Sequence, residues 1–326
     1  MIDSDPRAQF LAGMDRAARH WLVFWTGHAH QQEALLEARG HALRALAWCA
    51  TCDGSLDVAI DLALAMHGHM MWLGGWHEWQ ALLWQLFARA SVAADPERQF
   101  ALRHHISTIC WRLHRLDESI ALSEENQRWA ISAGDRPRQL QVAMGLAETY
   151  LNAEAYDRAL ACAEEVAALA ATLNALAQEA DGLIDAARAL LGLDELAEAE
   201  RRLQRALSLA AAAGDVTYHA KAQLFIGHAA ARGERWDEAL RWFEAALELV
   251  ASYGDEVGCA TIKSHIGCAL MEFGRWDEAR RLLEEAVRVH RRCGNLPAEQ
   301  LARQRLRELE TRRAAAYHTT QEEAST

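Results

Sequence analysis

The phrase Trp236-Asp237-Glu238-Ala239 returns as Trp276-Asp277-Glu278-Ala279, and an earlier form of it is Tyr156-Asp157-Arg158-Ala159. Its first residue belongs to a column that occupies every fortieth position of the chain, made of Trp76, Leu116, Tyr156, Leu196, Trp236 and Trp276. A period of this length is typical of repeat arrays, in which each unit packs on its neighbours. The sequence therefore predicts a stack of similar units.

A second column marks the junction between units. Its members are Asp95, Asp135, Asp215, Asp255 and Asn295, with Ala175 as the exception, and Gly134, Gly214, Gly254 and Gly294 precede four of them. Glycine can end a helix because it adopts positive φ without a steric penalty. Asp or Asn can then cap the next helix by accepting a hydrogen bond from a free amide. We therefore expect a Gly-Asp turn between units.

Small residues form two further columns, one in each helix of a unit. They are Ser107, Ala147, Ala187, Gly227 and Gly267 in the first helix, and Ser119, Ala159, Ala199, Ala239 and Ala279 in the second. Small side chains at matched positions allow two antiparallel helices to approach closely. Only four prolines occur, and helix-forming residues dominate the chain. The predicted fold class is all-α, a right-handed α-solenoid of antiparallel helix hairpins with a 40-residue period.

The pattern divides the chain into four parts. Residues 1–54 read as an N-terminal helical region, with a degenerate repeat as the alternative. Residues 55–294 hold six hairpins, residues 295–312 form a C-terminal capping helix, and residues 313–326 are expected to be a disordered tail.

Two hairpins depart from the pattern. Ser119, Ser123 and Asn126 stand where apolar residues are expected, so we expect that hairpin to be the least stable of the array. In the preceding unit Trp79 and His67 occupy small-residue positions, which requires a larger gap between the helices or a shifted register.

Composition and motifs exclude several classes of function. The net charge of −12 argues against nucleic acid as the main partner. No apolar run is long enough for a membrane span, and no signal peptide is recognisable, so we expect a cytoplasmic protein. The chain lacks a phosphate-binding loop and a marked nucleophile, and its paired histidines have poor spacing for a shared metal. We therefore expect no enzyme activity, no cofactor and no metal.

The repeat phrase resembles the tetratricopeptide repeat family. The resemblance rests on Trp236-Asp237-Glu238-Ala239-Leu240, followed by Phe243 and Ala246-Leu247, with Gly227 in the preceding helix. The 40-residue unit is longer than the usual unit of about 34 residues, and a Gly-Asp junction replaces the usual proline. The resemblance implies a concave groove that is lined by the first helix of each unit and binds a protein or peptide.

Carried over through the small-residue column, the groove positions mix charged, polar and apolar residues. They are His104, Thr108, Trp111, Arg112, Met144, Glu148, Asn152, Asp181, Arg188, Lys221, Leu224, His228 and Arg232. Their balance is less acidic than that of the whole chain, which favours a polar or acidic peptide held by arginines and by Trp111. The alternative is that solvated helix faces carry mixed charges without any ligand.

A second resemblance concerns the N-terminal side. The stretch Leu56-Asp57-Val58-Ala59-Ile60-Asp61-Leu62-Ala63, followed by Trp72-Leu73-Gly74-Gly75-Trp76, looks like the first repeat after the winged-helix region of STAND signal-transduction ATPases. This implies the autoinhibitory, ligand-binding sensor of such a protein, with a nucleotide-binding and winged-helix domain as a partner on the N-terminal side. The alternative is a stand-alone adaptor or co-chaperone that binds a peptide in its groove.

Overall fold

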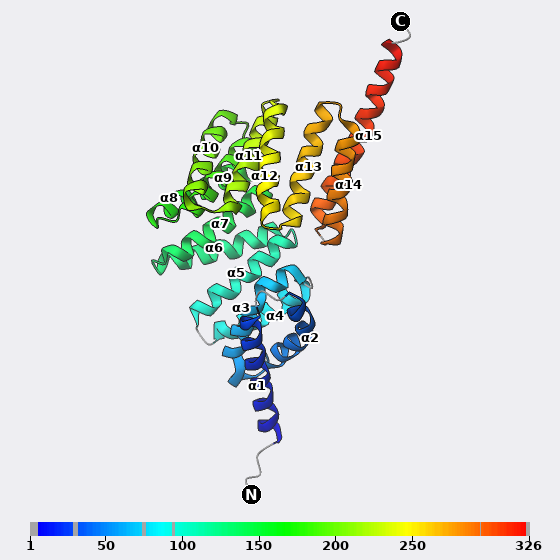
Figure 1. The fold of residues 1–326 in the computed structure, drawn as a ribbon. Helices are drawn as coiled ribbons and strands as arrows, with labels where there is room; N and C mark the ends of the chain where they lie inside the picture. Colours follow the sequence, from blue (N-terminus) through cyan, green and yellow to red (C-terminus); the bar gives the residue numbers. More distant parts are fainter. Residues whose placement is uncertain (1–5, 29–31, 74–75, 93–94, 294, 324–326) are drawn as a thin grey trace. The chain divides into compact units, whose positions relative to one another are not determined.

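The computed structural model describes residues 6–28, 32–73, 76–92, 95–293 and 295–323. Within these ranges the chain forms α-helices and one short 3₁₀ helix, and no strand is present. The helices follow one another as antiparallel hairpins, so the predicted all-α solenoid class is confirmed (Figure 1). The contacts divide the chain into two compact units, residues 1–153 and residues 154–326.

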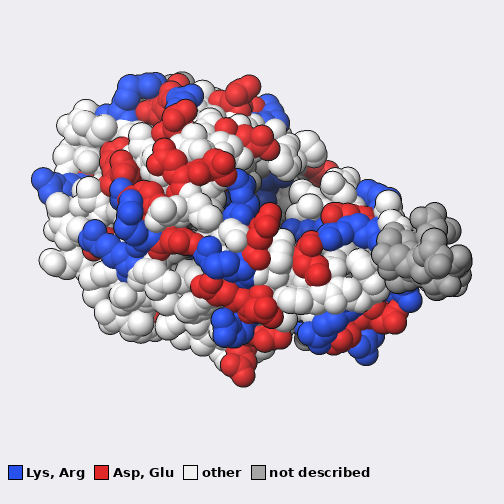
Figure 2. Space-filling model, turned by 90° about the horizontal axis from the view of Figure 1, so that it is seen from above, with Lys and Arg blue, Asp and Glu red and all other residues white. Residues whose placement is uncertain are grey.

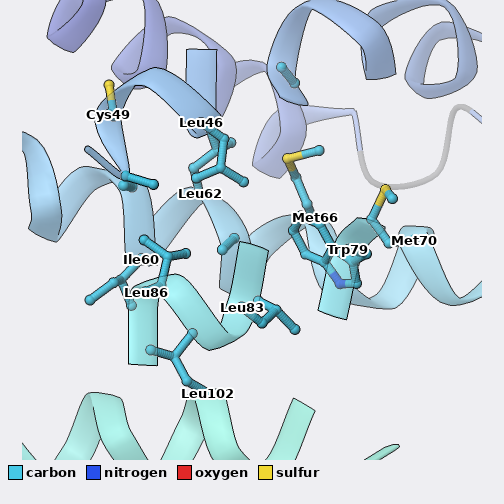
Figure 3. Close-up of a cluster of buried hydrophobic side chains, with 14 of the residues drawn as sticks. Leu46, Cys49, Ile60, Leu62, Met66, Met70, Trp79, Leu83, Leu86 and Leu102 are labelled. Carbon is cyan, nitrogen blue, oxygen red and sulfur yellow. The ribbon is translucent and has the colours of Figure 1, made fainter. Parts of the chain in front are cut away.

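Unit 1 contains the first seven α-helices and one 3₁₀ turn, Asp53–Ser55. The α-helices are α1 Pro6–Gly27, α2 Gln32–Cys49, α3 Leu56–Leu73, α4 Trp76–Val92, α5 Pro96–Arg112, α6 Leu116–Ser132 and α7 Arg136–Asn152. Its core joins α1 to α6, and Figure 3 shows Leu46, Leu62, Leu83 and Leu102 among its buried side chains. The helices of the N-terminal region therefore share their core with the first repeats.

Trp79 shows how α3 and α4 accommodate two large residues at small-residue positions. Its ring is almost fully buried, and its Nε1 donates to His67 Nδ1 over 3.4 Å. A cavity of about 320 Å³ lies beside it, lined by α2, α3 and α4 residues that include Leu43, Met70 and Leu82. The bulky pair thus leaves unfilled space next to the α3–α4 hairpin.

Unit 2 contains the remaining eight α-helices. They are α8 Tyr156–Thr172, α9 Leu176–Gly192, α10 Leu196–Ala213, α11 Val216–Arg232, α12 Trp236–Ser252, α13 Glu256–Glu272, α14 Trp276–Arg292 and α15 Leu296–Glu323. Phe243 of α12 packs against Gly227 of α11, where a β-carbon would lie 2.6 Å from the ring. A small residue on one helix therefore receives a large one from the other.

The helices keep the period found in the sequence. The first helices of successive 40-residue repeats begin at Pro96, Arg136, Leu176, Val216 and Glu256, so their starts are evenly spaced along the chain. Each capping aspartate accepts from a backbone amide of the first turn, over 3.1 Å at Asp95, 3.0 Å at Asp135 and Asp215, and 2.8 Å at Asp255. Gly134, Gly214 and Gly254 have positive φ. The Gly-Asp junction is confirmed at these turns; Gly294 lies outside the described residues.

The turn inside each hairpin from α5 to α14 uses the left-handed conformation, for the most part without glycine. The residue in this conformation has φ between 54° and 67° in four of the described turns, at His114, Glu154, Asp194 and Glu234. In the described α13–α14 turn it is Gly274, and glycine is the residue type that favours this region. These turns carry no recognisable signal in the sequence because their residues are ordinary helix or surface types.

The C-terminal helix corrects one expectation. The sequence pattern predicts a disordered tail over residues 313–326, but α15 continues from Leu296 to Glu323. After Pro297 the segment contains no glycine or proline, and Ala314 to Ala316 favour helix strongly, so nothing stops the helix at residue 312. Residues 324–326 lie outside the described part of the chain.

Candidate functional site

In unit 2 the predicted groove residues of α9 and α11 come together. The α9 helix packs on α11, and Lys221 Nζ lies 2.5 Å from Asp181 Oδ1. Lys221 is partly exposed, whereas the Asp181 side chain is largely buried beneath it. The two residues occupy the same position of successive first helices, so the repeat register itself creates this ion pair.

A second carboxylate, which the sequence analysis missed, links this pair to Arg188. Asp185 is buried, and its Oδ1 accepts from Lys221 Nζ over 3.2 Å and from Arg188 Nη1 over 3.0 Å. The Arg188 guanidinium also lies over the Phe225 ring, 5.0 Å from its centroid. Buried carboxylates with two cationic partners are satisfied and held rigidly. Arg188 of α9 and Lys221 of α11 are therefore fixed in place by internal partners.

Arg232 lies at the C-terminal end of α11, in a more open position. Its Nη2 contacts Asp194 Oδ1 over 2.8 Å, and both side chains are mostly exposed. An exposed ion pair of this kind contributes about 0–1 kcal/mol to stability. Arg232 can therefore exchange Asp194 for another partner at little cost in free energy.

Leu224 and His228 lie farther toward α13, and both are partly exposed. The His228 ring packs edge-on against the ring of His265, with centroids 4.2 Å apart, and also contacts Phe225 and Phe243. Burial lowers the pKa of His228 to about 4, and the charges of Arg305 and Arg188 act in the same direction. His228 is therefore a neutral imidazole at pH 7.

Two further residues of this face, His265 and Arg305, were also missed. Arg305 of α15 donates from Nη1 to Ser264 Oγ over 2.8 Å, and its Nη2 lies 3.2 Å from His265 Nδ1. Phe225, His265 and Arg305 stand at 40-residue steps, one position after the column of Leu224 and Ser264. The period could have found them, but the interpretation of α15 as a solvated cap excluded that helix from the column.

In unit 1 the predicted residues lie on α5 and α7. Thr108 donates to the backbone carbonyl of His104 over 3.0 Å, and Asn152 donates to Glu148 Oε1 over 3.3 Å. The His104 Nε2 lies 3.2 Å from Gln141 Nε2, which connects the two helices. Met144 is partly exposed on α7. These side chains form a mainly neutral polar face.

Arg112 is the cation of this face, and it is held by aromatic rings. Its guanidinium carbon lies 5.3 Å from the centroid of the Trp111 ring and 5.9 Å from that of Trp76. Burial of the group lowers its pKa, although its side chain reaches solvent at the end of α5. Among the described residues no carboxylate pairs with it. Arg112 therefore presents a positive charge that the described part of the chain does not neutralise.

Two histidines near this face stack on each other. His67 and His105 lie ring to ring with centroids 3.7 Å apart. Burial lowers the pKa of His67 to about 4 and the pKa of His105 well below its usual value. Within the described residues no three His, Cys, Asp or Glu side chains are placed to hold a metal ion.

On the face drawn in Figure 2, acidic and basic side chains are interleaved. Such mixing agrees with the ion pairs between equivalent helices of neighbouring hairpins, including Arg312 of α15 with Glu272 of α13 and Arg202 of α10 with Glu164 of α8. No helix in the described ranges has the combined length and apolar character that crossing a bilayer requires.

Comparison with known proteins identifies the repeat. The family model described as tetratricopeptide repeat matches residues 218–292, which span α11 to α14. Residues 218–292 are tetratricopeptide repeats. Such repeats imply a protein-binding scaffold. No curated protein matches the chain significantly.

Several solved structures share the tetratricopeptide fold. NprR in complex with its cognate peptide NprX has a TM-score of 0.62 at 12% identity, over 78% of this chain and 74% of that one. The apo form of RapI has a TM-score of 0.57 at 12% identity, over 78% of this chain and 98% of that one. At these identities the likeness shows the fold alone.

A STAND protein with a tetratricopeptide repeat sensor, from Pyrococcus horikoshii, is also similar. Its TM-score is 0.52 at 13% identity. The alignment covers 83% of this chain but 43% of that protein, so the chain spans less than half of its length.

Proposed function

We propose that this protein is a non-catalytic peptide-binding scaffold that senses a signal through the faces of its first helices. The proposal rests on the surroundings of Arg112. Its guanidinium is partly desolvated and lies against the rings of Trp76 and Trp111, and it has no carboxylate partner among the described residues. A cation flanked by aromatic rings suits an acidic or polar peptide, because the charge attracts a carboxylate while the rings contact apolar groups.

Unit 2 presents a rigid face of its own. Arg188 and Lys221 are fixed on the buried Asp185, so the polar groups of α9 and α11 are ordered before a ligand arrives. Preordered groups reduce the entropy that binding costs. The proposed binding residues are the thirteen named from the sequence, divided between the faces of the two units, together with Asp185 and Phe225 in unit 2.

The biological setting that we favour is the sensor region of a STAND-type signalling protein, held next to its nucleotide-binding and winged-helix domains. The similarity to the STAND protein with a tetratricopeptide sensor supports this setting. A stand-alone peptide receptor or adaptor is the second candidate, and the similarity to NprR with its bound peptide favours it.

The proposal can be tested by recovering the ligand. The immobilised protein is incubated with the low-molecular-weight fraction of an extract of its native cells, and eluted peptides are identified by mass spectrometry and resynthesised. We expect a recovered peptide to bind the wild-type protein at least about tenfold more tightly than Arg112→Gln, which is a difference of about 1.4 kcal/mol.

Arg128→Gln is the matched control, because Arg128 is an exposed arginine on α6, the second helix of the same hairpin. Equal loss of affinity in both variants would show a general charge effect, and unchanged affinity in Arg112→Gln would remove Arg112 from the site. The STAND setting has its own test: the captured peptide should change the nucleotide turnover of a natural protein that contains both this chain and an ATPase domain.

A further inference from the structure

Arg305 differs from the other cations of the unit 2 face in the chemistry of its partners. Four cations there are paired with carboxylates of the chain: Arg188, Lys221, Arg232 and Arg312. Arg305 contacts the hydroxyl of Ser264 and the imidazole of His265, and none of the described carboxylates forms an ion pair with it. Its positive charge is therefore left without a counter-charge in the described part of the chain.

The hydrogen bonds of Arg305 fix the roles of its two partners. A guanidinium can only donate, so Ser264 Oγ and His265 Nδ1 must both accept. The neutral His265 then carries its proton on Nε2, and the Ser264 hydroxyl retains its own proton for donation. Apart from the second lone pair of the Ser264 hydroxyl, the groups that remain available for hydrogen bonding are donors: the unused guanidinium N–H groups, the Ser264 O–H and the His265 Nε2–H.

The surroundings strengthen this donor set. The Ser264 side chain is buried, and His265 packs against the rings of His228 and Phe243. Burial, together with the charges of His228 and Arg305, keeps the pKa of His265 well below its usual value, so the imidazole is neutral. Apolar walls around a charge lower the local dielectric and strengthen its attraction for an opposite charge.

Acidic residues lie nearby but have other positions or partners. Glu272 is held by Arg312 through two hydrogen bonds of 2.6 and 2.9 Å. Glu308 is one turn farther along α15 and is exposed, with Arg312 at 3.8 Å. Asp185 is taken by Lys221 and Arg188. These three carboxylates thus form ion pairs with cations other than Arg305.

We propose that Arg305, Ser264 and His265 form a recess that binds an oxyanion of the ligand. Only an acceptor-rich, negatively charged group complements a cluster whose free capacity is donors and positive charge. In a peptide this group is a carboxylate, from an acidic side chain or the C-terminus, or a phosphoryl group. The inference deepens the proposed function and rests on it, since it makes α15 a wall of the binding face.

The experiment measures anion binding directly, without the natural peptide. Protein labelled with ¹⁵N-histidine is titrated with glutarate and, in a separate arm, with inorganic phosphate, and the ring nitrogens of His265 and His228 are followed by NMR. Glutaramide, which has the same length without charge, is the ligand control. We expect saturable shifts at His265 with at least one anion below about 50 mM, and none with glutaramide.

Two variants locate the site. Arg305→Gln should weaken anion binding about tenfold or more. Arg305→Lys should retain part of the affinity, because lysine keeps the positive charge but lacks the planar guanidinium that donates two parallel hydrogen bonds. Arg307→Gln, an exposed neighbour on α15, should leave the affinity within about twofold. Far-UV circular dichroism of each variant checks that the helices are intact. Stronger binding of glutarate assigns a carboxylate, and stronger binding of phosphate assigns a phosphoryl group.

The proposal is overturned if neither anion gives a saturable shift, or if Arg305→Gln binds as well as wild type. These results are separable from the proposed function. A captured peptide that binds Arg305→Gln with full affinity would leave peptide binding intact but exclude this recess. Anion binding at Arg305 without any captured peptide would support the recess and count against the peptide scaffold.

Discussion

The α5–α6 hairpin and the α11–α12 hairpin use the same positions of the repeat with opposite chemistry. At the matched contacts α5–α6 has Ser107, Ser119, Ser123 and Asn126, and α11–α12 has Gly227, Ala239, Phe243 and Ala246. All eight positions are buried. The helices nevertheless begin and end at equivalent residues, so one backbone register accepts a polar or an apolar interior.

The polar hairpin is joined by a chain of hydrogen bonds. Ser119 Oγ donates to the Ser107 carbonyl over 2.9 Å, and Ser123 Oγ donates to Ser107 Oγ over 3.1 Å. Asn126 Nδ2 donates to the Phe100 carbonyl over 3.0 Å. Each of these buried polar groups has a partner, which avoids the large cost of an unsatisfied one.

The apolar hairpin depends on shape. Phe243 fills the space that Gly227 leaves, with Ala239 and Ala246 fully buried on either side. Burying a phenylalanine side chain contributes roughly 1.5–3 kcal/mol, whereas a hydrogen bond adds about 0.5–1.5 kcal/mol net. The small-residue column thus sets the distance between the two helices, and the residue that faces it determines how strongly they pack. Lower stability of α5–α6 stays a prediction.

The largest effect is expected from Phe243→Ala. The substitution leaves a cavity above Gly227, so the free energy of unfolding should fall by about 3–5 kcal/mol. Urea denaturation followed by circular dichroism measures the change. Phe273→Ala is the matched control, because Phe273 is 40% exposed, and it should change stability by less than about 0.5 kcal/mol. A loss below about 1 kcal/mol for Phe243→Ala would contradict packing as the main contribution.

A smaller effect is expected from Asn126→Ala on the polar side. The change removes a donor to the Phe100 carbonyl and the acceptor of Arg103, whose Nη1 lies 2.8 Å from Asn126 Oδ1. The free energy of unfolding should fall by about 1–3 kcal/mol, measured by the same urea denaturation. Asn152→Ala, at an exposed helix end, serves as the control. If Asn126→Ala costs as much as Phe243→Ala, the two hairpins are equally strong and the comparison fails.

The smallest effect per residue is expected from mild acid, at a pH only slightly below 6.5. His67, beside the polar hairpin, and His228, in the apolar one, each have a folded pKa of about 4 against an ordinary value of 6.5. The unfolded chain therefore binds protons first, and the stability present above pH 6.5 is lost progressively as pH falls toward 4. Urea midpoints at neutral and at mildly acidic pH should differ, and His67→Gln and His228→Gln should each reduce the difference. An effect of only one variant would show that the hairpins also differ electrostatically.

Most of the helical framework could be predicted because a constant period fixes where each helix begins. Gly-Asp junctions have a local cause, so Asp135 and Asp215 can be identified as caps without the structure. The proposed binding face was harder to predict. Whether Arg188 is free depends on Asp185, which lies one helical turn away and whose burial follows from packing against neighbouring helices. Arg305 was missed because α15 was interpreted as a capping helix and was left out of the column, although Phe225 and His265 give its register.

Because the helices begin at a constant spacing of 40 residues, the array can be divided into equivalent segments. The segment from Asp215 to Gly254 starts with its own N-cap and ends with its own left-handed glycine, and the following segment starts at Asp255 in the same phase. Duplicating or removing such a segment leaves each cap beside the helix that it serves. The length of the array can therefore change by whole modules, through recombination between copies, without a new turn or a new cap having to arise.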